Sequence, residues 1–275
     1  MIADPRRNGD ARELLATVDG GDGRGEEGRV TSTSPLHSAH AVLVFVRHGE
    51  STGNERGVFS GWRDLALTER GRMQAAAAGC SLSQRGIEFS SVFTSELRRA
   101  VDTCELLLSA MGRGDMARTR SWRLNERHCG AMHGLDKQQC KDLWGDELAR
   151  TYRRSWEQGP PPAPAGSVDD PRTDQRYRGV AEPLPLTESM GQMSARVMIA
   201  WEQLVRPSLT AGSRVLVVGH GMALRALGRP VEGLTDPALP DWKLASAAPR
   251  VYCLDSQLRP LSIESIDNGH SMPDE

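Results

Sequence analysis

Two histidines that follow short apolar runs are the residues in this sequence best suited to chemistry. His48 comes after Val42–Val46 and Arg47 in the segment RHGES, and His220 comes after residues 215–219 in the segment GHG. A neutral imidazole can attack phosphorus and leave again, so that one phosphoryl transfer becomes two easier steps through a phosphohistidine. The guanidinium beside His48 disfavours the charged imidazolium and can bind phosphate oxygens through two N–H groups. The two motifs therefore indicate a phosphoryl-transfer site.

The apolar runs also predict where these histidines lie in the fold. Each run is short, rich in β-branched residues and uninterrupted, which is typical of a strand buried on both faces of a parallel sheet. Ligands bind such sheets beyond the carboxyl ends of the strands, so both histidines are expected at one rim. A third short strand is predicted at 91–94. Strands that alternate with helices predict a three-layer α/β/α sandwich with a mainly parallel sheet.

The helices between these strands are predicted from capping residues and apolar periodicity. Thr68, Ser95 and Thr187 are good N-caps, and the apolar residues after each of them recur at helical spacing. A further helix is predicted at 222–227. The run at 251–254 is expected to form an edge strand.

Composition divides the chain into a core and two tails. Residues 1–40 are rich in Gly, Asp, Arg, Ser and Thr and are expected to be a disordered extension. The domain is expected at 41–262, with a cap insertion at about 122–180 and a flexible C-terminal tail at 263–275. The Pro/Gly/Ala stretch at 159–166 can be neither helix nor central strand.

Charge and cysteine usage exclude several classes of protein. The 275 residues carry a formal net charge of −2, which argues against a nucleic-acid binder. No apolar run approaches the roughly 18 residues of a membrane span. The five cysteines are scattered without zinc-ligand spacing, so no metal site is expected. The first residues lack the apolar core of a signal peptide, and a cytoplasmic location is expected.

Further polar residues could complete a phosphate site. Asn54, Ser60 and Gly61 offer side-chain and backbone donors, although alone they would form an ordinary turn. Arg99 could hold phosphate oxygens beside the histidine. Glu126 could shuttle the proton of a substrate hydroxyl, although a single glutamate is more often a surface group.

Three cations in the cap region have two possible roles. Lys137, Arg153 and Arg154 can be solvated surface residues, which is the commoner case for such side chains. Alternatively, they clamp a substrate carboxylate or a second phosphate. The residues alone leave both open.

Taken together, the motifs resemble those of the cofactor-dependent phosphoglycerate mutases, members of the histidine phosphatase superfamily. The resemblance covers about residues 41–262 and rests on RHGES, SGW, TSELRRA, WRLNERHCG, YRR, LPLTES and GHGMALRAL. It implies a phosphoglycerate mutase-like fold and a possible homodimer. The implied site has His48 as phosphoacceptor and Glu126 as proton donor. Arg47, Arg99 and His220 would form the phosphate pocket, and Asn54, Ser60 and Gly61 would contact the ligand. Lys137, Arg153 and Arg154 would recognise the substrate carboxylate and distal phosphate, and Gly221, Cys129 and Met222 would lie on the substrate wall.

This chain departs from the family pattern in the wall of the site. Cys129 follows NERH where the family usually has Tyr, and Met222 follows the second HG where it usually has Asn. Gly53 replaces the usual Trp, and KLASAAPR replaces an Ile-Pro-Thr-Gly pattern. Each lost hydrogen bond is worth about 0.5–1.5 kcal/mol. Phosphohistidine chemistry is therefore expected to persist with less efficient mutase turnover.

The sequence predicts a phosphoglycerate mutase of glycolysis and gluconeogenesis. It would interconvert 2-phosphoglycerate and 3-phosphoglycerate, primed by 2,3-bisphosphoglycerate and without a metal. A small phosphorylated acid is the expected partner, and neither nucleic acid nor membrane is expected. One alternative is a histidine-type phosphatase in which water takes the phosphoryl group. Another is a non-catalytic protein that binds phosphorylated ligands.

Overall fold

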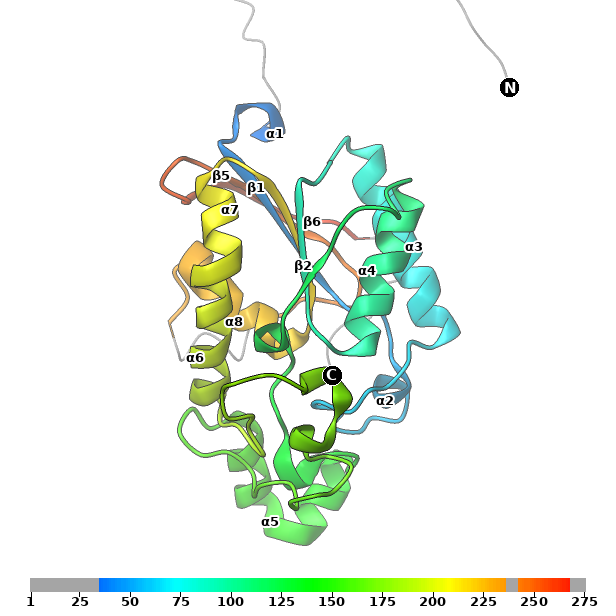
Figure 1. Cartoon of the computed structure of the whole chain (residues 1–275), viewed down its shortest axis with the longest axis vertical. Coiled ribbons are helices and arrows are strands. Elements are labelled where there is room, and N and C mark those ends of the chain that lie inside the picture. Colours follow the sequence, from blue (N-terminus) through cyan, green and yellow to red (C-terminus); the bar gives the residue numbers. More distant parts are fainter. Residues whose placement is uncertain (1–34, 236–241, 268–275) are drawn as a thin grey trace, which may run out of the picture. The chain divides into compact units, whose positions relative to one another are not determined.

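The computed structural model describes residues 35–235 and 242–267, and these build one mixed six-stranded sheet (Figure 1). The strand order is β3-β2-β4-β1-β5-β6. The first four of these are mutually parallel, β5 runs antiparallel to β1, and β6 runs antiparallel to β5. This confirms the α/β class with a mainly parallel sheet. The strands are β1 (Ala41–Arg47), β2 (Ser91–Thr94), β3 (Thr119–Arg120), β4 (Arg214–Gly219), β5 (Arg250–Leu254) and β6 (Pro260–Ser265).

The two strands that precede the histidines lie side by side at the centre. β1 and β4 pair in parallel, with Phe45 opposite Val217 and Arg47 opposite Gly219. Because successive side chains point to opposite faces, Leu43 and Phe45 enter one apolar core while Val44 enters the other. Burial on both faces explains why these strands read as uninterrupted apolar runs.

Helices cover both faces of the sheet, as predicted. In Figure 1, α3 and α4 lie on one face, and α6, α7 and α8 lie on the other. The α-helices are α1 (Pro35–Ser38), α2 (Thr52–Glu55), α3 (Glu69–Gln84), α4 (Arg98–Ala110), α5 (Lys137–Arg154), α6 (Met190–Ala200), α7 (Arg206–Thr210) and α8 (Gly221–Glu232), and the π-helical turn η5 (Trp201–Val205) joins α6 to α7.

Only one of the three predicted N-caps is correct. Thr68 caps α3 and accepts from Gly71 N. Ser95 does not cap α4, whose N-cap is Leu97, because its hydroxyl is bound to His220 instead. Thr187 donates to the Pro160 carbonyl, and the cap of α6 is Ser189, two residues later.

The predicted edge strand is an inner strand. β5 lies between β1 and β6, because the chain turns back after β5 and pairs as β6 from Pro260 to Ser265. The residues of β6 are mostly exposed, including the apolar Leu261 and Ile263. Order therefore extends past the boundary predicted at 262, and Ile266 is buried. Residues 268–275 of the expected tail lie outside the described residues.

The chain is also ordered before the predicted start at residue 41. α1 precedes β1, and Leu36 packs against the core that Val44 enters. The part of the predicted extension from 1 to 34 lies outside the described residues. Within the described part of the chain, no helix is long and apolar enough to cross a membrane.

The segment predicted as a cap lies beyond the carboxyl ends of the parallel strands (Figure 1). It contains one long helix, α5, which the sequence did not predict. The stretch 159–166 is neither helix nor strand, as predicted. Four short 3-10 turns complete the cap, namely η1 (Trp122–Leu124), η2 (Gly130–Met132), η3 (Pro171–Thr173) and η4 (Gln175–Tyr177).

Candidate active site

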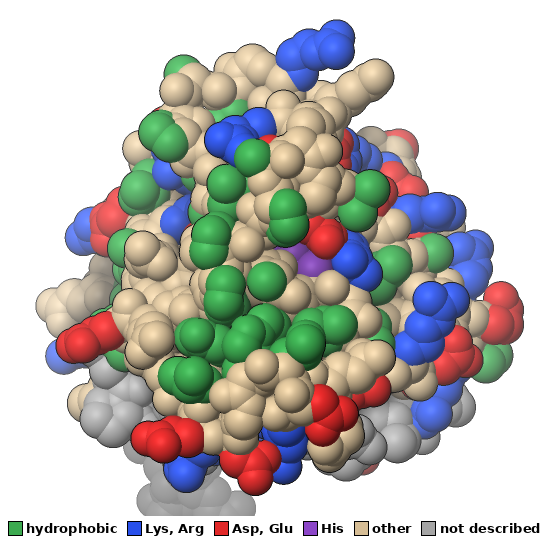
Figure 2. Space-filling view, turned by 90° about the horizontal axis from the view of Figure 1, so that it is seen from below, with side chains coloured by type: hydrophobic (Ala, Val, Ile, Leu, Met, Phe, Trp, Pro, Cys, Tyr) green, Lys and Arg blue, Asp and Glu red, His purple; other side chains and the backbone are tan. Residues whose placement is uncertain are grey.

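A cavity of about 360 Å³ lies between the carboxyl ends of the central strands and the cap. Figure 2, which views the molecule from the cap side, shows a histidine at the bottom of a hollow with acidic and basic side chains beside it. His220 lies behind His48 and does not line the cavity. The cavity is lined by all other residues predicted for the site: Arg47, His48, Asn54, Ser60, Gly61, Arg99, Glu126, Cys129, Lys137, Arg153, Arg154, Gly221 and Met222.

The imidazole of His48 is held in one tautomer with its outer nitrogen unprotonated. Nδ1 lies 2.7 Å from the Gly49 carbonyl oxygen, which can only accept. Nε2 receives the Nε–H of Arg99 at 3.2 Å. The proton is therefore on Nδ1, and Nε2 carries the lone pair. Nε2 is the atom that can attack phosphorus.

His48 also stays neutral. Burial lowers the pKa of His48 well below its ordinary 6.5, and the positive charges of Arg99 and Arg47 lower it further. The like-charge effect of Arg47 was expected from the sequence. Burial, which follows from the position at the end of a central strand, is the larger cause. A neutral imidazole is the nucleophilic form.

The ring of His220 contacts that of His48 but has different hydrogen-bond partners. The two ring centroids are 5.2 Å apart. Ser95 Oγ accepts from Leu97 N and lies 2.7 Å from His220 Nε2, so its hydroxyl hydrogen is free to donate to that nitrogen. When the Ser95 hydroxyl donates to Nε2, the proton of His220 is on Nδ1, a buried atom with no hydrogen-bond partner in the described structure. Nε2 then has no free lone pair with which to attack.

Two arginines, the buried Arg99 and the half-buried Arg47, provide positive charge beside His48. Arg99 is 1 % exposed and donates to the Gly61 and Arg63 carbonyls as well as to His48. Arg47 donates to the Leu244 carbonyl at 3.4 Å. Burial lowers the pKa of each arginine to about 10, so both remain charged at neutral pH. Buried guanidiniums of this kind favour a phosphoryl dianion as counter-charge.

Glu126 projects its carboxylate into the cavity from the loop before η2. Oε1 accepts from the backbone N–H of Arg127 at 2.8 Å, and Oε2 accepts from that of Met222 at 3.2 Å. The backbone of Glu126 is also fixed, because its carbonyl accepts from Arg196. Both carboxylate oxygens are thus oriented by backbone N–H groups, and the group can exchange a proton with a bound hydroxyl.

Both ends of α5 contribute cations to the same cavity. Lys137 is the first residue of α5, and Arg153 and Arg154 are the last two. A straight helix of 18 residues would be about 27 Å long and would hold these side chains far apart. Gly145 has φ 77° and ψ 162°, which breaks the helix and folds its second half back. The kink brings the three cations to one cavity.

Several cavity residues were not predicted from the sequence. Arg225 follows Met222 by three residues on α8, and one helical turn places both on one face, so the GHGMALRAL motif contained a signal for it. Arg127 is part of NERH. The remaining ones carried no signal in the sequence: Val58, Phe59, Met190 and Lys243.

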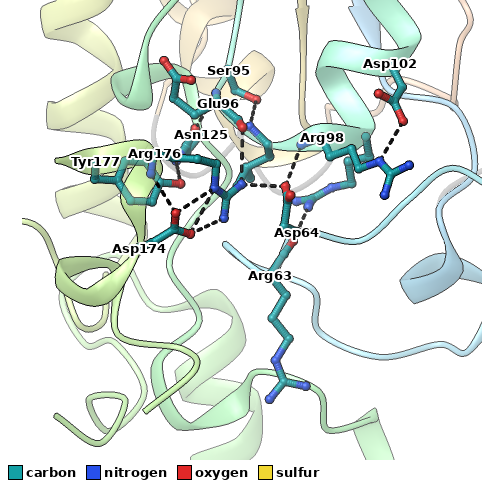
Figure 3. A network of polar contacts seen from close by, with 12 residues as sticks. Arg63, Asp64, Ser95, Glu96, Arg98, Asp102, Asn125, Asp174, Arg176 and Tyr177 are labelled. Carbon is teal, nitrogen blue, oxygen red and sulfur yellow. Dashed lines mark hydrogen bonds and ion pairs between the residues drawn. The ribbon is translucent and has the colours of Figure 1, made fainter. Parts of the chain in front are cut away.

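A polar network fixes the loops behind the site (Figure 3). Asp64 accepts from Arg98 N at 2.8 Å and from Arg176 Nη1 at 2.5 Å. Arg176 also donates to the carbonyl of Glu96, and Asn125 accepts from Glu96 N. The network therefore joins the cap to the loop that carries Ser95 and to the N-terminus of α4.

The comparison with known families agrees with this geometry. The model of the histidine phosphatase superfamily (branch 1) matches residues 43–175 and 166–260. A 2,3-bisphosphoglycerate-dependent phosphoglycerate mutase of Neisseria gonorrhoeae (strain NCCP11945) is 40% identical over 218 residues, which are 79% of this chain and 96% of that protein. The mutase of the same name from Pasteurella multocida (strain Pm70) has the same identity and coverage. The chain belongs to the histidine phosphatase superfamily, and its sequence resembles the cofactor-dependent mutases within it.

Solved structures show the same fold in phosphatases. The alpha-ribazole phosphatase from Shigella flexneri is similar with a TM-score of 0.62 at 20% identity, covering 85% of this chain and 99% of that one. A mycobacterial glucosyl-3-phosphoglycerate phosphatase is similar with a TM-score of 0.59 at 23% identity, covering 82% and 97%. At these identities the likeness shows the fold alone.

Buried histidines predict a loss of stability in mild acid. Burial lowers the pKa of His128 to about 4 and those of His48, His133 and His220 well below 6.5. Below pH 6.5 the unfolded chain binds protons at these sites and the folded chain does not, so stability falls as pH decreases. The slope is about 1.4 kcal/mol per pH unit for each histidine. Urea unfolding between pH 7.5 and pH 5 measures it.

The variant His128→Gln should remove one histidine's share of this slope. Tyr177→Phe provides the control, because it removes a buried hydroxyl whose pKa is raised to about 12 by burial and should therefore leave the slope unchanged. An unchanged slope in His128→Gln would mean that His128 is protonated in the folded protein.

Proposed function

We propose that this protein is a phosphoglycerate mutase that uses 2,3-bisphosphoglycerate as phosphoryl primer. The observation that carries the proposal is the neutral His48, with Nε2 directed at Arg99, in one cavity with Glu126 and the cations of α5. The 40% identity to proteins of that name over most of their length supports it. Glycolysis and gluconeogenesis in the cytoplasm would be the setting of this activity.

The residues fit a bisphosphorylated acid. The cavity is lined by eight arginine or lysine side chains and by one carboxylate, that of Glu126. When bound, 2,3-bisphosphoglycerate supplies the phosphoryl group that charges His48. The arginines beside His48 would hold the transferring group, and Lys137, Arg153 and Arg154 would hold the other anionic groups.

The transfer follows from the positions of two side chains. The Nε–H of Arg99 passes from His48 Nε2 to a phosphate oxygen, and the freed lone pair attacks phosphorus. A P–N bond forms, and the P–O bond of the donor breaks. Glu126 gives a proton to the departing oxygen and takes one back when a hydroxyl of phosphoglycerate attacks the phosphohistidine. The Nδ1–H bond to the Gly49 carbonyl keeps the ring oriented throughout. A phosphoglycerate that takes the group on its free hydroxyl becomes 2,3-bisphosphoglycerate, and transfer of the other phosphoryl group of that molecule to His48 completes the isomerisation.

An assay with 3-phosphoglycerate tests the proposal directly. We expect conversion to 2-phosphoglycerate that is slow without 2,3-bisphosphoglycerate and strongly stimulated by it. Release of inorganic phosphate with no isomerisation would identify a phosphatase. Binding of either acid without turnover would identify a non-catalytic binder.

Phosphatase activity is the second candidate, and the altered wall of the cavity favours it. The thiol of Cys129 is turned to the Arg127 carbonyl, and Met222 Sδ receives Arg225 Nη1 at 3.4 Å. Burial raises the pKa of Cys129 to about 11, so it offers a neutral thiol. Neither side chain gives the bound acid a strong hydrogen bond. A weakly held acid would leave the phosphohistidine open to water.

Restoring the family residues is therefore expected to improve mutase activity. The double variant Cys129→Tyr with Met222→Asn should raise isomerisation and lower the ratio of phosphatase to mutase turnover, by about fivefold if one hydrogen bond of about 1 kcal/mol is regained. The two residues line one cavity, so the double change is the informative one. A substrate panel on both proteins checks it. Unchanged isomerisation, with better turnover of another phosphate ester by the wild type, would show that the wall is adapted to that ester.

A further inference from the structure

His133 lies behind the cavity wall and takes no part in the transfer described above. Its side chain is 1% exposed. Nε2 lies 3.1 Å from the backbone nitrogen of Trp62 and 3.3 Å from that of Cys129, and both N–H groups donate to it. Trp62 follows the turn that contains Gly61, and Cys129 belongs to the cap. One imidazole nitrogen therefore joins two separate segments of the wall.

The ring also packs directly on Gly61. Gly61 has φ +44°, and a Cβ at that position would lie 1.9 Å from His133 Nε2 and 2.4 Å from Cδ2. The Gly61 carbonyl in turn accepts from Arg99 Nη2 at 2.8 Å, and Arg99 Nε donates to His48 Nε2 at 3.2 Å. Direct contacts thus lead from His133 through Gly61 and Arg99 to the attacking nitrogen.

The double acceptor role requires a neutral ring. Nε2 must be unprotonated to receive two N–H groups, so the proton is on Nδ1, which lies 3.8 Å from Asp169 Oδ1. Asp169 is held by two hydrogen bonds from Arg63. Burial lowers the pKa of His133 well below 6.5, and the neighbouring His128 and the positive charges of Arg63, Arg99 and Arg127 lower it further.

We infer that His133 is a positioning residue that sets the spacing between the Gly61 turn and the Cys129 wall and thereby directs Arg99 at His48. The inference rests on the proposed phosphoryl transfer, because it concerns the same site. His133 would meet two separate requirements, one of the fold and one of the site. The volume of the ring contributes to stability, whereas the acceptor at Nε2 is needed to place the catalytic groups.

Two variants separate these requirements. His133→Leu keeps an apolar side chain of similar size without an acceptor. His133→Gln restores one, since an amide oxygen has two lone pairs and can receive both N–H groups. Tyr252→Phe is the matched control, because it removes a buried hydrogen-bonding group, bound to Glu232, on a strand that does not line the cavity. Should His133→Leu not fold, His133→Met replaces it, since a thioether is only a weak acceptor.

The readout is the single-turnover rate at which 2,3-bisphosphoglycerate labels His48, measured together with the unfolding temperature. We expect His133→Leu to label up to about 100-fold more slowly, since small displacements of reacting groups have effects of that size. His133→Gln should label within a few-fold of the wild type. Tyr252→Phe should lose stability and label at the wild-type rate.

Labelling of His133→Leu at the wild-type rate would overturn the inference, as would a His133→Gln protein as slow as His133→Leu at equal stability. The same measurements separate a failure of the mutase proposal from a failure of the inference about His133. If the wild type takes up label without isomerising phosphoglycerate, the mutase proposal fails and the comparison of labelling rates still decides about His133. If the wild type takes up no label, the binding affinity of each variant for orthovanadate is measured in place of the labelling rate. Weaker binding by His133→Leu than by His133→Gln supports the inference, and equal binding overturns it.

Discussion

Replacing His48 with alanine should abolish covalent labelling by 2,3-bisphosphoglycerate and lower turnover on the order of 10⁴-fold or more, the scale seen when a nucleophile is removed. His48 Nε2 is the one cavity nitrogen of the described residues placed to attack as a neutral lone pair. It faces Arg99 and belongs to a ring whose pKa is lowered by burial. Mass spectrometry of the labelled protein at alkaline pH, where phosphohistidine survives, locates the phosphate.

The matched control is His220→Ala. His220 is also buried and lies in ring contact with His48, but its Nε2 faces the Ser95 hydroxyl. This variant should lose the ring that packs against His48 and label His48 more slowly, without moving the label. A label on His220, or one that persists in His48→Ala, would show that the two histidines have been assigned the wrong roles.

The positions of both histidines were predictable because burial leaves a strong trace in the sequence. A central parallel strand must be apolar on both faces, so β1 and β4 appear as continuous runs, and whatever follows them reaches the same rim. The capping residues were less reliable. Ser95 and Thr187 have the chemistry of an N-cap, but each is bound to a partner more than 20 residues away, His220 and the Pro160 carbonyl. At both positions a tertiary contact, and not the local preference for helix capping, determines what the side chain binds.

The outer part of the site was less accessible to sequence reasoning. Lys137 and Arg153 were assigned to one site only through the family resemblance, since their meeting depends on the kink at Gly145. A single glycine in a helical sequence pattern does not show whether the helix bends there or in which direction. Lys243 enters the cavity from the segment before β5, where the sequence differs from the family pattern. The edge strand β6 was missed although Leu261 and Ile263 alternate with polar residues along it, because the run is short and has no continuous apolar core.

Replacing Glu126 with glutamine should slow transfer from a phosphoglycerate by about 10²- to 10⁴-fold, the usual contribution of a positioned acid or base. The leaving group of a phosphoglycerate is an alkoxide, which departs readily only if it receives a proton. Glu126 has both carboxylate oxygens in the site, fixed by the backbone N–H groups of Arg127 and Met222. The amide has nearly the same shape and cannot exchange that proton.

A second substrate separates proton transfer from structural disturbance. In Glu126→Gln the amide NH₂ would face the Met222 N–H, so one backbone donor loses its acceptor whichever substrate is bound. Such a disturbance slows all substrates alike. A nitrophenyl phosphate releases a stabilised phenolate that needs no proton, so its transfer to His48 should fall less than about tenfold if the loss is in proton donation. Equal losses for the alkyl and the nitrophenyl ester would mean that Glu126 holds the wall in place and that the proton is supplied by another group.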